Sequence, residues 1–390
     1  MRALFSPILD PARSNLLLHM DKYFPSSYED SRARFLQSLD LIQQKWPSTQ
    51  LESHPLKNFP ELSIDWLWAR ANNKKTLVII STAEHGIEGY VGYAMMKVFV
   101  EEFAPRLNPE NTGLLLIHGL NPWGMKYHRK VNENSVDLNR NFVIDENFDS
   151  AINPEFHRVK NLINPQTRIQ SFGLENIWFG GRVIQALFTA GTATVTKATL
   201  LGQHHTPNGF YYGGTNYEEG TSVAMELYRR GLEDYQSVIQ VDMHTGYGPR
   251  DQMSIIIPPL DPMTSEETSR KFNYPLVLKI NAEEFYDISG DMGAYYYELR
   301  DKYFPDRHLF ACGFEFGTFG SSLLARIRSL RAMVFENQLH WHGTKSEKAE
   351  HRIRKEFEEL YFPSEPKWRE KALADGRQAF EGILRAYQLL

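Results

Sequence analysis

Cysteine is almost absent from this sequence, because Cys312 is the single cysteine among 390 residues. An intrachain disulfide is therefore excluded, and this usage is typical of a reducing compartment. No uninterrupted apolar run approaches the ~18 residues that a membrane-spanning helix needs. The first residues, MRALFSPILDPARS, hold no apolar core of signal-peptide length. We therefore expect a soluble, cytoplasmic protein.

An excess of basic residues is also missing. Lys and Arg together number 43 and Asp and Glu 48, which gives a formal net charge of −5. This balance indicates neither a nucleic-acid partner nor an anionic membrane surface. Hydrophobic residues at 42% and charged residues at 23% form an ordinary globular mixture, which excludes disordered and fibrous classes.

Several common catalytic motifs are absent. The sequence contains no G-x-S-x-G elbow, no Walker A loop, no G-x-G-x-x-G and no H-E-x-x-H. A serine hydrolase, a nucleotide-phosphate enzyme or a dinucleotide enzyme would therefore lack its usual signature.

Short apolar runs alternate with helical patterns along the chain. The first helical pattern covers residues 27–46, and Ser27 is placed to cap it. Predicted strands begin at Ser63, Thr76, Gly113, Val238, Ser254 and Leu309. This alternation predicts an α/β fold, a layered sheet with helices on both faces, whose functional groups lie at strand ends and in the loops that follow them.

Two regions depart from this alternation. Residues 142–235 are rich in Asn, Gly, Thr and Tyr, and no linker separates them, so we interpret them as an elaboration within one catalytic domain, residues 1–343. Residues 344–390 are charged and helical, and we predict that they form an extension packed on that domain. Its apolar side chains recur near helical spacing as a packing stripe: Trp368, Ala372, Phe380, Leu384 and Tyr387.

Two histidines and a glutamate follow predicted strands. His85 and Glu88 come directly after the apolar run TLVIISTA, and His244 closes the run VIQVDMHTG. If these strands are neighbours, the three side chains converge at one edge of the sheet, and two His with one Glu form a zinc ligand set with an open position for water. A solvated loop also explains a lone His-x-x-Glu pair. Asp242 is either an acceptor for an imidazole N–H or a surface carboxylate.

Further polar residues stand where chemistry would need them. Arg129 and the pair Asn139 and Arg140 lie in a polar loop, and guanidinium groups hold carboxylates and polarise carbonyls. Glu315 interrupts the apolar run LFACGFEFG, where a buried carboxylate needs either an ion-pairing partner or a functional role. A solvated basic loop and a structural ion pair are the respective alternatives.

Taken in order, these motifs resemble the zinc carboxypeptidase superfamily, and the segments GQHHTPNGFYYGG, DMHTGYGP, EFGT and LRAMVFENQLHWHG resemble an uncharacterised domain-of-unknown-function branch of it. The resemblance covers roughly residues 15–345. It implies a three-layer α/β/α sandwich around a mixed, mostly parallel sheet, and one zinc ion as cofactor. Ile87 departs from the family, whose digestive members carry Arg at this position.

The resemblance also implies a role for each matching residue. It implies zinc ligands at His85, Glu88 and His244, a general base and acid at Glu315, and an oxyanion-stabilising group at Arg129. Substrate contacts are implied at Asn139, Arg140 and, in the segment GDMGAYYYELRD, Tyr296. Other conspicuous side chains are interpreted as packing, capping or pocket-lining groups: His204, His205, His340, His342 and Cys312.

The expected activity is therefore zinc-dependent hydrolysis of an amide bond, either a C-terminal peptide bond or that of an N-acyl amino acid, with a small peptide or acylated amino acid as substrate. Two alternatives remain open. One is a zinc-dependent deacylase or esterase acting on a small non-peptide substrate, and the other is an inactive binding protein of the same fold. The sequence does not indicate an oligomeric state.

Overall fold

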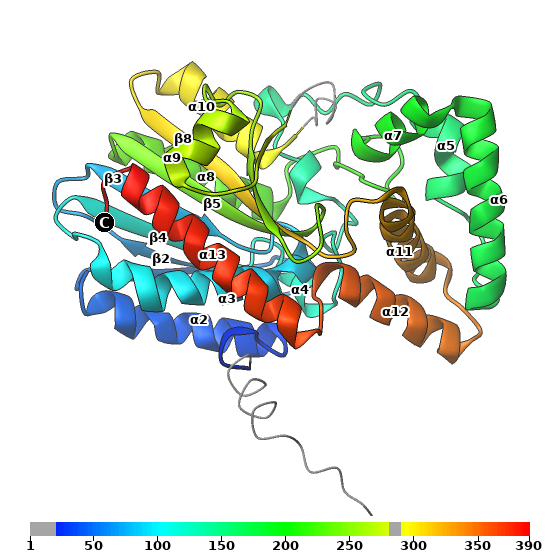
Figure 1. Cartoon of the computed structure of the whole chain (residues 1–390), viewed down its shortest axis with the longest axis horizontal. Coiled ribbons are helices and arrows are strands. Elements are labelled where there is room, and N and C mark those ends of the chain that lie inside the picture. The colour runs from blue at the N-terminus through cyan, green and yellow to red at the C-terminus, as the bar shows by residue number, and fades with distance from the viewer. Residues whose placement is uncertain (1–20, 281–289) are drawn as a thin grey trace, which may run out of the picture.

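The centre of the protein is one eight-stranded sheet, seen in a computed structural model that describes residues 21–280 and 290–390 (Figure 1). The segment MRALFSPILDPARS, used above to argue against a signal peptide, lies outside the described residues. The strands are β1 (Gln50–Pro55), β2 (Ser63–Ala69), β3 (Thr76–Ser81), β4 (Thr112–His118), β5 (Ser237–Gly246), β6 (Met253–Ile257), β7 (Val277–Lys279) and β8 (His308–Gly317).

The strands follow the order β1-β2-β4-β3-β5-β8-β6-β7 across the sheet. The pairs β3–β4, β3–β5, β5–β8 and β6–β7 are parallel, and β1–β2, β2–β4 and β6–β8 are antiparallel. The prediction of a mixed, mostly parallel sheet is confirmed. Because β3, β5 and β8 are adjacent and parallel, their carboxyl ends meet at one edge of the sheet.

The central strands are continuous apolar runs because helices cover both of their faces. In β3, Val78 and Ile80 pack on one side, and Leu77 and Ile79 on the other. The first side is covered by α2 (Tyr28–Gln43), α3 (Gly89–Val98), α9 (Ser265–Phe272) and α13 (Pro366–Ala386). The second side is covered by α8 (Glu219–Asp234) and α10 (Met292–Tyr303). The predicted three-layer architecture is therefore confirmed.

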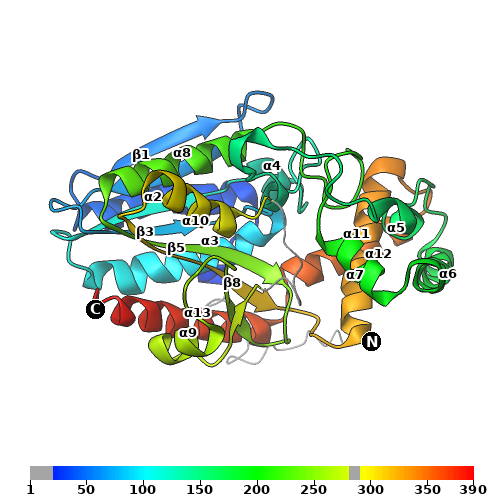
Figure 2. The same ribbon diagram turned by 90° about the horizontal axis from the view of Figure 1, so that it is seen from above.

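A helical lobe stands at one end of the sheet, and the C-terminus lies at the opposite end in both views (Figures 1 and 2). The lobe has its own apolar core, which includes Phe156, Phe179 and Phe335. It contains α5 (Phe156–Ile163), α6 (Phe172–Ala190), α7 (Thr192–Leu200), α11 (Leu323–His342) and α12 (Glu347–Tyr361). In the described part of the chain, no helix is both long and apolar enough to cross a bilayer.

The structure refines how the irregular regions are used. The region interpreted as an elaboration, residues 142–235, supplies α5, α6 and α7 to the lobe, but its last helix, α8, covers the sheet. The C-terminal residues also divide, because α12 packs in the lobe and α13 packs on the sheet. Trp368, Ala372, Phe380 and Leu384 are all buried there, which confirms the predicted packing stripe.

A buried histidine at the end of β4 makes stability depend on pH. His118 lies 5.1 Å from the ring of Phe35 and its Nε2 is 2.8 Å from the Ser31 hydroxyl. Burial lowers the pKa of His118 to about 4. Between about pH 4 and pH 6.5 the unfolded chain therefore binds a proton at this histidine that the folded chain does not. The contribution of His118 to the unfolding free energy is full above about pH 6.5 and is lost as the pH falls toward 4. We expect about 3 kcal/mol of unfolding free energy to disappear across this window.

Urea unfolding at pH 4.5 to 7 checks this expectation. His118→Gln should flatten the dependence of the unfolding free energy on pH, whereas substitution of the exposed His351 by Gln should leave it unchanged. An unaltered slope in His118→Gln would contradict the assignment.

Candidate active site

Three neighbouring strands deliver polar side chains to the same edge of the sheet. His85 and Glu88 follow β3 through the helical turn η1 (Gly86–Glu88), and His244 lies near the end of β5. Glu315 in β8 stands beside His244, because the two residues are register partners in the parallel pair β5–β8. The predicted convergence of His85, Glu88 and His244 therefore follows from strand order and direction, and Glu315 joins them at the same edge.

The turn that carries His85 and Glu88 is fixed to the loop after β4 by its main chain. The amides of Gly86 and Ile87 donate to the carbonyl oxygens of Lys130 and Arg129 at 3.1 and 3.0 Å. At Gly86 a Cβ atom would lie 2.1 Å from the main-chain carbon of Gly124. Only glycine allows the turn to approach Gly124 this closely, and this approach fixes the position of the turn that carries His85 and Glu88.

We expect Gly86→Ala to displace the turn, because backbone atoms cannot yield as a flexible side chain does. The substitution should cost about 1 to 3 kcal/mol of stability and weaken metal binding. Gly173→Ala is the matched control, since a Cβ there meets nothing within 4 Å. Thermal unfolding and metal titration of both variants test this, and equal behaviour of the two would contradict it.

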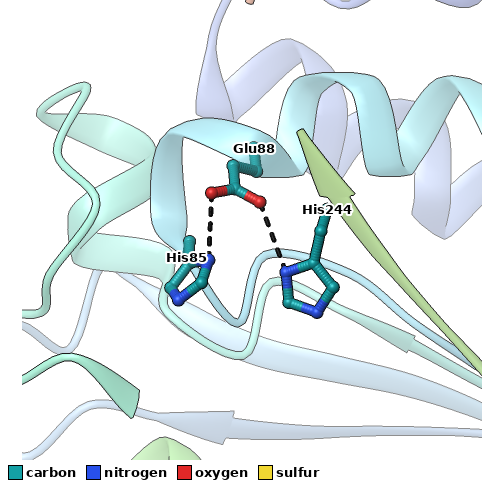
Figure 3. A group of neighbouring side chains, drawn as sticks. All are labelled: His85, Glu88 and His244. Carbon is teal, nitrogen blue, oxygen red and sulfur yellow. Dashed lines mark ion pairs between the residues drawn. The ribbon is translucent and has the colours of Figure 1, made fainter. Parts of the chain in front are cut away.

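The three side chains form a compact cluster in which both imidazoles direct Nδ1 at one carboxylate (Figure 3). His85 Nδ1 lies 2.9 Å from Oε1 of Glu88, and His244 Nδ1 lies 3.4 Å from Oε2. The Glu88 carboxylate also accepts the main-chain N–H of Thr245 at 2.9 Å. Burial alone would raise the pKa of Glu88, but the two imidazoles outweigh it and lower the pKa to about 2. Glu88 is thus held ionised.

The opposite nitrogen of each imidazole faces a second carboxylate. His85 Nε2 lies 3.0 Å from Asp137, and His244 Nε2 lies 2.8 Å from Asp242. Burial tends to raise the pKa of Asp137, but Lys130 and then His85 hold it well below its usual range. A carboxylate behind each ligating imidazole orients the ring and fixes its tautomer in metal sites. Of the two interpretations of Asp242 given above, the structure favours the acceptor for an imidazole.

The cluster has the chemistry of a metal site. Two imidazole nitrogens and one carboxylate oxygen, all within 4.8 Å of one another, suit a single zinc ion with one position left open. His85 Nδ1 is buried and faces the Glu88 carboxylate, and an ion between them would be held by both groups. The residues present therefore fit the ion that the motifs imply.

Glu315 lies beside this cluster with one oxygen fixed. Its Oε1 accepts the main-chain N–H of Tyr247 at 2.8 Å. Burial, and next the negative charge of Glu88, raise the pKa of Glu315 to about 8. A carboxyl group with a pKa close to neutrality is suited to take and return a proton at physiological pH.

Lys130 and Tyr211 adjoin the cluster although the sequence analysis assigned them no role. Lys130 Nζ lies 2.7 Å from His85 Nε2 and forms an ion pair with Asp137. The ring of Tyr211 lies near two cations, with its centroid 4.8 Å from Lys130 Nζ and 4.9 Å from the guanidinium carbon of Arg140. Tyr211 also has a φ of 50°, which is costly for a bulky residue and is found where function demands it.

Arg129 is turned toward the lobe. Its Nε and Nη2 donate to the carboxylate of Glu336 in α11 at 2.7 and 3.3 Å, and both side chains are largely buried. The Nη1 group is buried without a hydrogen-bond partner in the described residues. It borders a cavity of about 30 Å³, shared with Asp137 and Tyr211, which is large enough for about one water molecule. Lys130, not Arg129, therefore contacts the cluster, through His85.

Asn139 and Arg140 are engaged with the main chain. Asn139 Oδ1 accepts the N–H of Met292 at 3.0 Å. Arg140 donates to the carbonyl oxygens of Asn139 and Leu200 at 2.6 and 2.8 Å, so it caps the end of α7, and its Nε is buried without a described hydrogen-bond partner. A substrate carboxylate would have to compete with these carbonyl groups.

The expectation for Tyr296 is corrected by the structure. Tyr296 is fully buried between α10 and the sheet, with its ring centroid 4.5 Å from that of Tyr228 and its hydroxyl donating to the Tyr228 carbonyl. Its neighbours Tyr295 and Tyr297 are buried as well, so α10 presents this tyrosine run to the core. Tyr211, next to Lys130 and Arg140, is a tyrosine that does lie beside the cluster.

The remaining histidines and the cysteine lie away from the ligand set. His204 Nδ1 is 2.7 Å from the carbonyl oxygen of Gly214, and His205 Nδ1 is 2.8 Å from the Thr206 hydroxyl. His340 and His342 are in the last turn of α11, and Cys312 is buried in β8.

Glu84 is an acid to which the sequence analysis assigned no role. Glu84 directly precedes His85, is fully buried, and has a pKa raised well above its usual value by burial.

Residues 24–375 match a family described as "Protein of unknown function (DUF2817)". The match extends well beyond residue 345, where the resemblance was expected to end. No curated protein matches the chain.

The chain is similar to several solved structures at low sequence identity. Bovine thrombin-activatable fibrinolysis inhibitor, in complex with a tick carboxypeptidase inhibitor, is 15% identical over 82% of this chain and 97% of that chain, with a TM-score of 0.45. Carboxypeptidase A from Helicoverpa armigera is 14% identical over 84% and 80%, with a TM-score of 0.44. An aspartoacylase family protein from Mesorhizobium loti is 14% identical over 76% and 67%, with a TM-score of 0.36. These similarities concern the fold, so the chemistry of the site has to be inferred from the side chains of this chain itself.

Proposed function

The chain belongs to the family of proteins of unknown function DUF2817, and we propose that it is a zinc-dependent hydrolase that cleaves an amide bond of a small substrate. One observation carries the proposal. One buried and one half-buried imidazole, each backed by a carboxylate, turn Nδ1 toward Glu88, and Glu315 stands in register beside His244. This arrangement combines a metal site with a proton-transferring group, which is what metal-assisted hydrolysis requires.

A zinc ion held by His85, Glu88 and His244 would supply Lewis-acid activation of water and of the substrate carbonyl. Asp137 and Asp242 keep the two rings in the tautomer that leaves Nδ1 free to ligate. Glu315 receives a proton as water attacks and delivers it to the leaving amine. The hydrogen bond from the Tyr247 amide fixes one of its oxygens, so the other is oriented for this transfer.

Positive charge beside the cluster supports stabilisation of the developing oxyanion. Lys130 is the nearest cation to the ligand imidazoles, and we propose it for this role together with Arg129, whose Nη1 remains without a described hydrogen-bond partner. The ion pair with Glu336 orients Arg129 and partly offsets the positive potential that Arg129 creates at the site. Lys130 is similarly paired with Asp137.

Substrate binding through a free carboxylate is the second part of the proposal. Arg140 Nε has no described hydrogen-bond partner and could donate to a substrate carboxylate. The other guanidinium N–H groups would have to give up their hydrogen bonds to main-chain carbonyl oxygens to bind the same carboxylate. We expect Arg140→Ala to raise KM for a free-acid substrate roughly ten- to a hundredfold, because a charge-assisted hydrogen bond is worth about 1.5 to 3 kcal/mol. The amidated form of the same substrate should be equally poor for wild type and variant. Arg326→Ala, at an exposed position of α11, is the control.

Equal kcat/KM of the wild type for the free acid and for the amide would show that the protein does not recognise a substrate carboxylate. In that case the deacylase or esterase alternative, which shares the metal site, would be favoured.

Metal analysis combined with a substrate panel tests the proposed function. The purified protein is expected to retain one zinc ion per chain and to hydrolyse members of a panel of N-acyl amino acids and dipeptides. Turnover confined to acyl esters would favour the esterase alternative. Bound zinc without turnover of any panel member would favour a binding protein, and a protein that takes up no zinc would overturn the proposal.

A further inference from the structure

The outer face of α6 exposes an unusual amount of apolar surface. This helix lies at the far edge of the lobe, remote from the sheet (Figure 1). Ile177 is 71% exposed and Phe188 is 93% exposed. The other large apolar side chains exposed on α6 are Leu174, Trp178, Ile184 and Leu187. Contiguous apolar surface of this kind marks an interaction site.

The same face carries no charge. The charged residues of α6 are Glu175 and Arg182, and they form an ion pair with each other at 2.9 Å. Glu175 is buried and Arg182 is mostly covered, so neither is presented outward. The absence of exposed lysine and arginine argues against an anionic membrane surface, which basic residues beside an apolar face would attract. A partner recognised by charge is disfavoured for the same reason.

Two glycines in the middle of α6 are not required by the protein's own packing. Glycine is a poor helix former, yet Gly180 and Gly181 occupy adjacent positions within the helix. A Cβ atom at either position would meet nothing within 4 Å. The close approach of a second helix would explain them, because small residues let two backbones come near.

Four of the six exposed apolar positions are arranged symmetrically about Gly181, the central residue of Phe172–Ala190. Moving outward from Gly181 by equal steps pairs Trp178 with Ile184 and Leu174 with Phe188, all of which are exposed. An antiparallel copy of the same helix would therefore set these four apolar side chains against one another, whereas Ile177 would face Gln185 of the copy. Such self-complementarity is what a two-fold symmetric interface requires. The steps of three and four residues match the seam of packed helices.

We propose that the protein forms a homodimer in which α6 packs against α6 of a second copy, antiparallel, with Gly181 at the two-fold axis. This surface lies in the lobe and not at the metal cluster, so the dimer does not depend on the proposed hydrolase function.

Cysteine cross-linking of the full chain tests the geometry. Cys312 is buried, so introduced cysteines report without background. Gly181→Cys should form an intermolecular disulfide with itself under mild oxidation. Leu174→Cys alone should not, because its two copies would lie about 21 Å apart along the axis, but a mixture of Leu174→Cys and Phe188→Cys should cross-link. Cross-linking of Leu174→Cys with itself and none of the mixture would overturn the antiparallel arrangement.

Sedimentation tests the association itself. Wild type is expected at twice its chain mass of 45.2 kDa. Ile184→Asp should raise the dissociation constant at least a hundredfold, since the symmetric contact carries the charge twice, and exposed Leu41→Asp on α2 is the matched control. A monomer at micromolar concentration would overturn the proposal. A monomer that binds zwitterionic phosphatidylcholine vesicles through α6, with binding lost in Ile184→Asp, would assign the face to a membrane instead.

Discussion

Glu315→Gln is expected to lower kcat by about 10²- to 10⁴-fold while zinc content and folding stay unchanged. The amide has nearly the shape of the carboxylic acid, and it can still accept the hydrogen bond that Tyr247 donates. It cannot take a proton from water or return one to a leaving amine. Removing the carboxylate therefore removes the proton transfer and leaves the metal cluster in place.

The matched control is Glu61→Gln, an exposed glutamate for which no change in kcat is expected. Turnover measured with zinc content in the same preparations separates loss of chemistry from loss of metal. Near-wild-type turnover in Glu315→Gln would assign the proton transfer to another group.

Replacing either ligand histidine is expected to remove the metal. His85→Ala and His244→Ala each leave a two-ligand remnant, and zinc in proteins relies on three or four protein ligands. We expect stoichiometric zinc to disappear from both variants, and all turnover with it. Asp137→Asn and Asp242→Asn should weaken zinc binding by only about 10- to 100-fold, because they alter the partners of the ligands and not the ligands.

The order of these effects is the informative result. Zinc titration of the four variants and of the exposed control His351→Ala should give two strong losses, two intermediate losses and no change in the control. Full zinc occupancy in His85→Ala or His244→Ala would place the metal elsewhere.

The parts of the fold that the sequence predicted are those buried on both sides. β3, β4 and β5 are continuous apolar runs because helices cover both faces, and β2, β6 and β8 are also mostly buried. β1 was not predicted because it is an edge strand whose residues QLESHP are largely exposed. β7 has only three residues, which is too short for any periodicity.

The site divides in the same way. His85, Glu88, His244 and Glu315 lie at or just beyond strand ends, where strand order alone determines which side chains meet. Lys130 and Tyr211 lie in loops, and their direction depends on tertiary contacts that no local pattern encodes. Tyr296 shows the opposite failure, because its position along the chain was compatible with the site while α10 turned its side chain into the core.

The two main-chain hydrogen bonds that fasten the ligand turn have a consequence for how this site can change. Gly86 and Ile87 are held by the carbonyl oxygens of Lys130 and Arg129, which every amino acid possesses. These two hydrogen bonds therefore persist whatever side chains stand at 129 and 130. The main chain that holds the turn is separate from the side chains that set the charge beside the site, so a substitution at 129 or 130 alters the ion pairs with Glu336 or Asp137 but not the attachment of the turn itself.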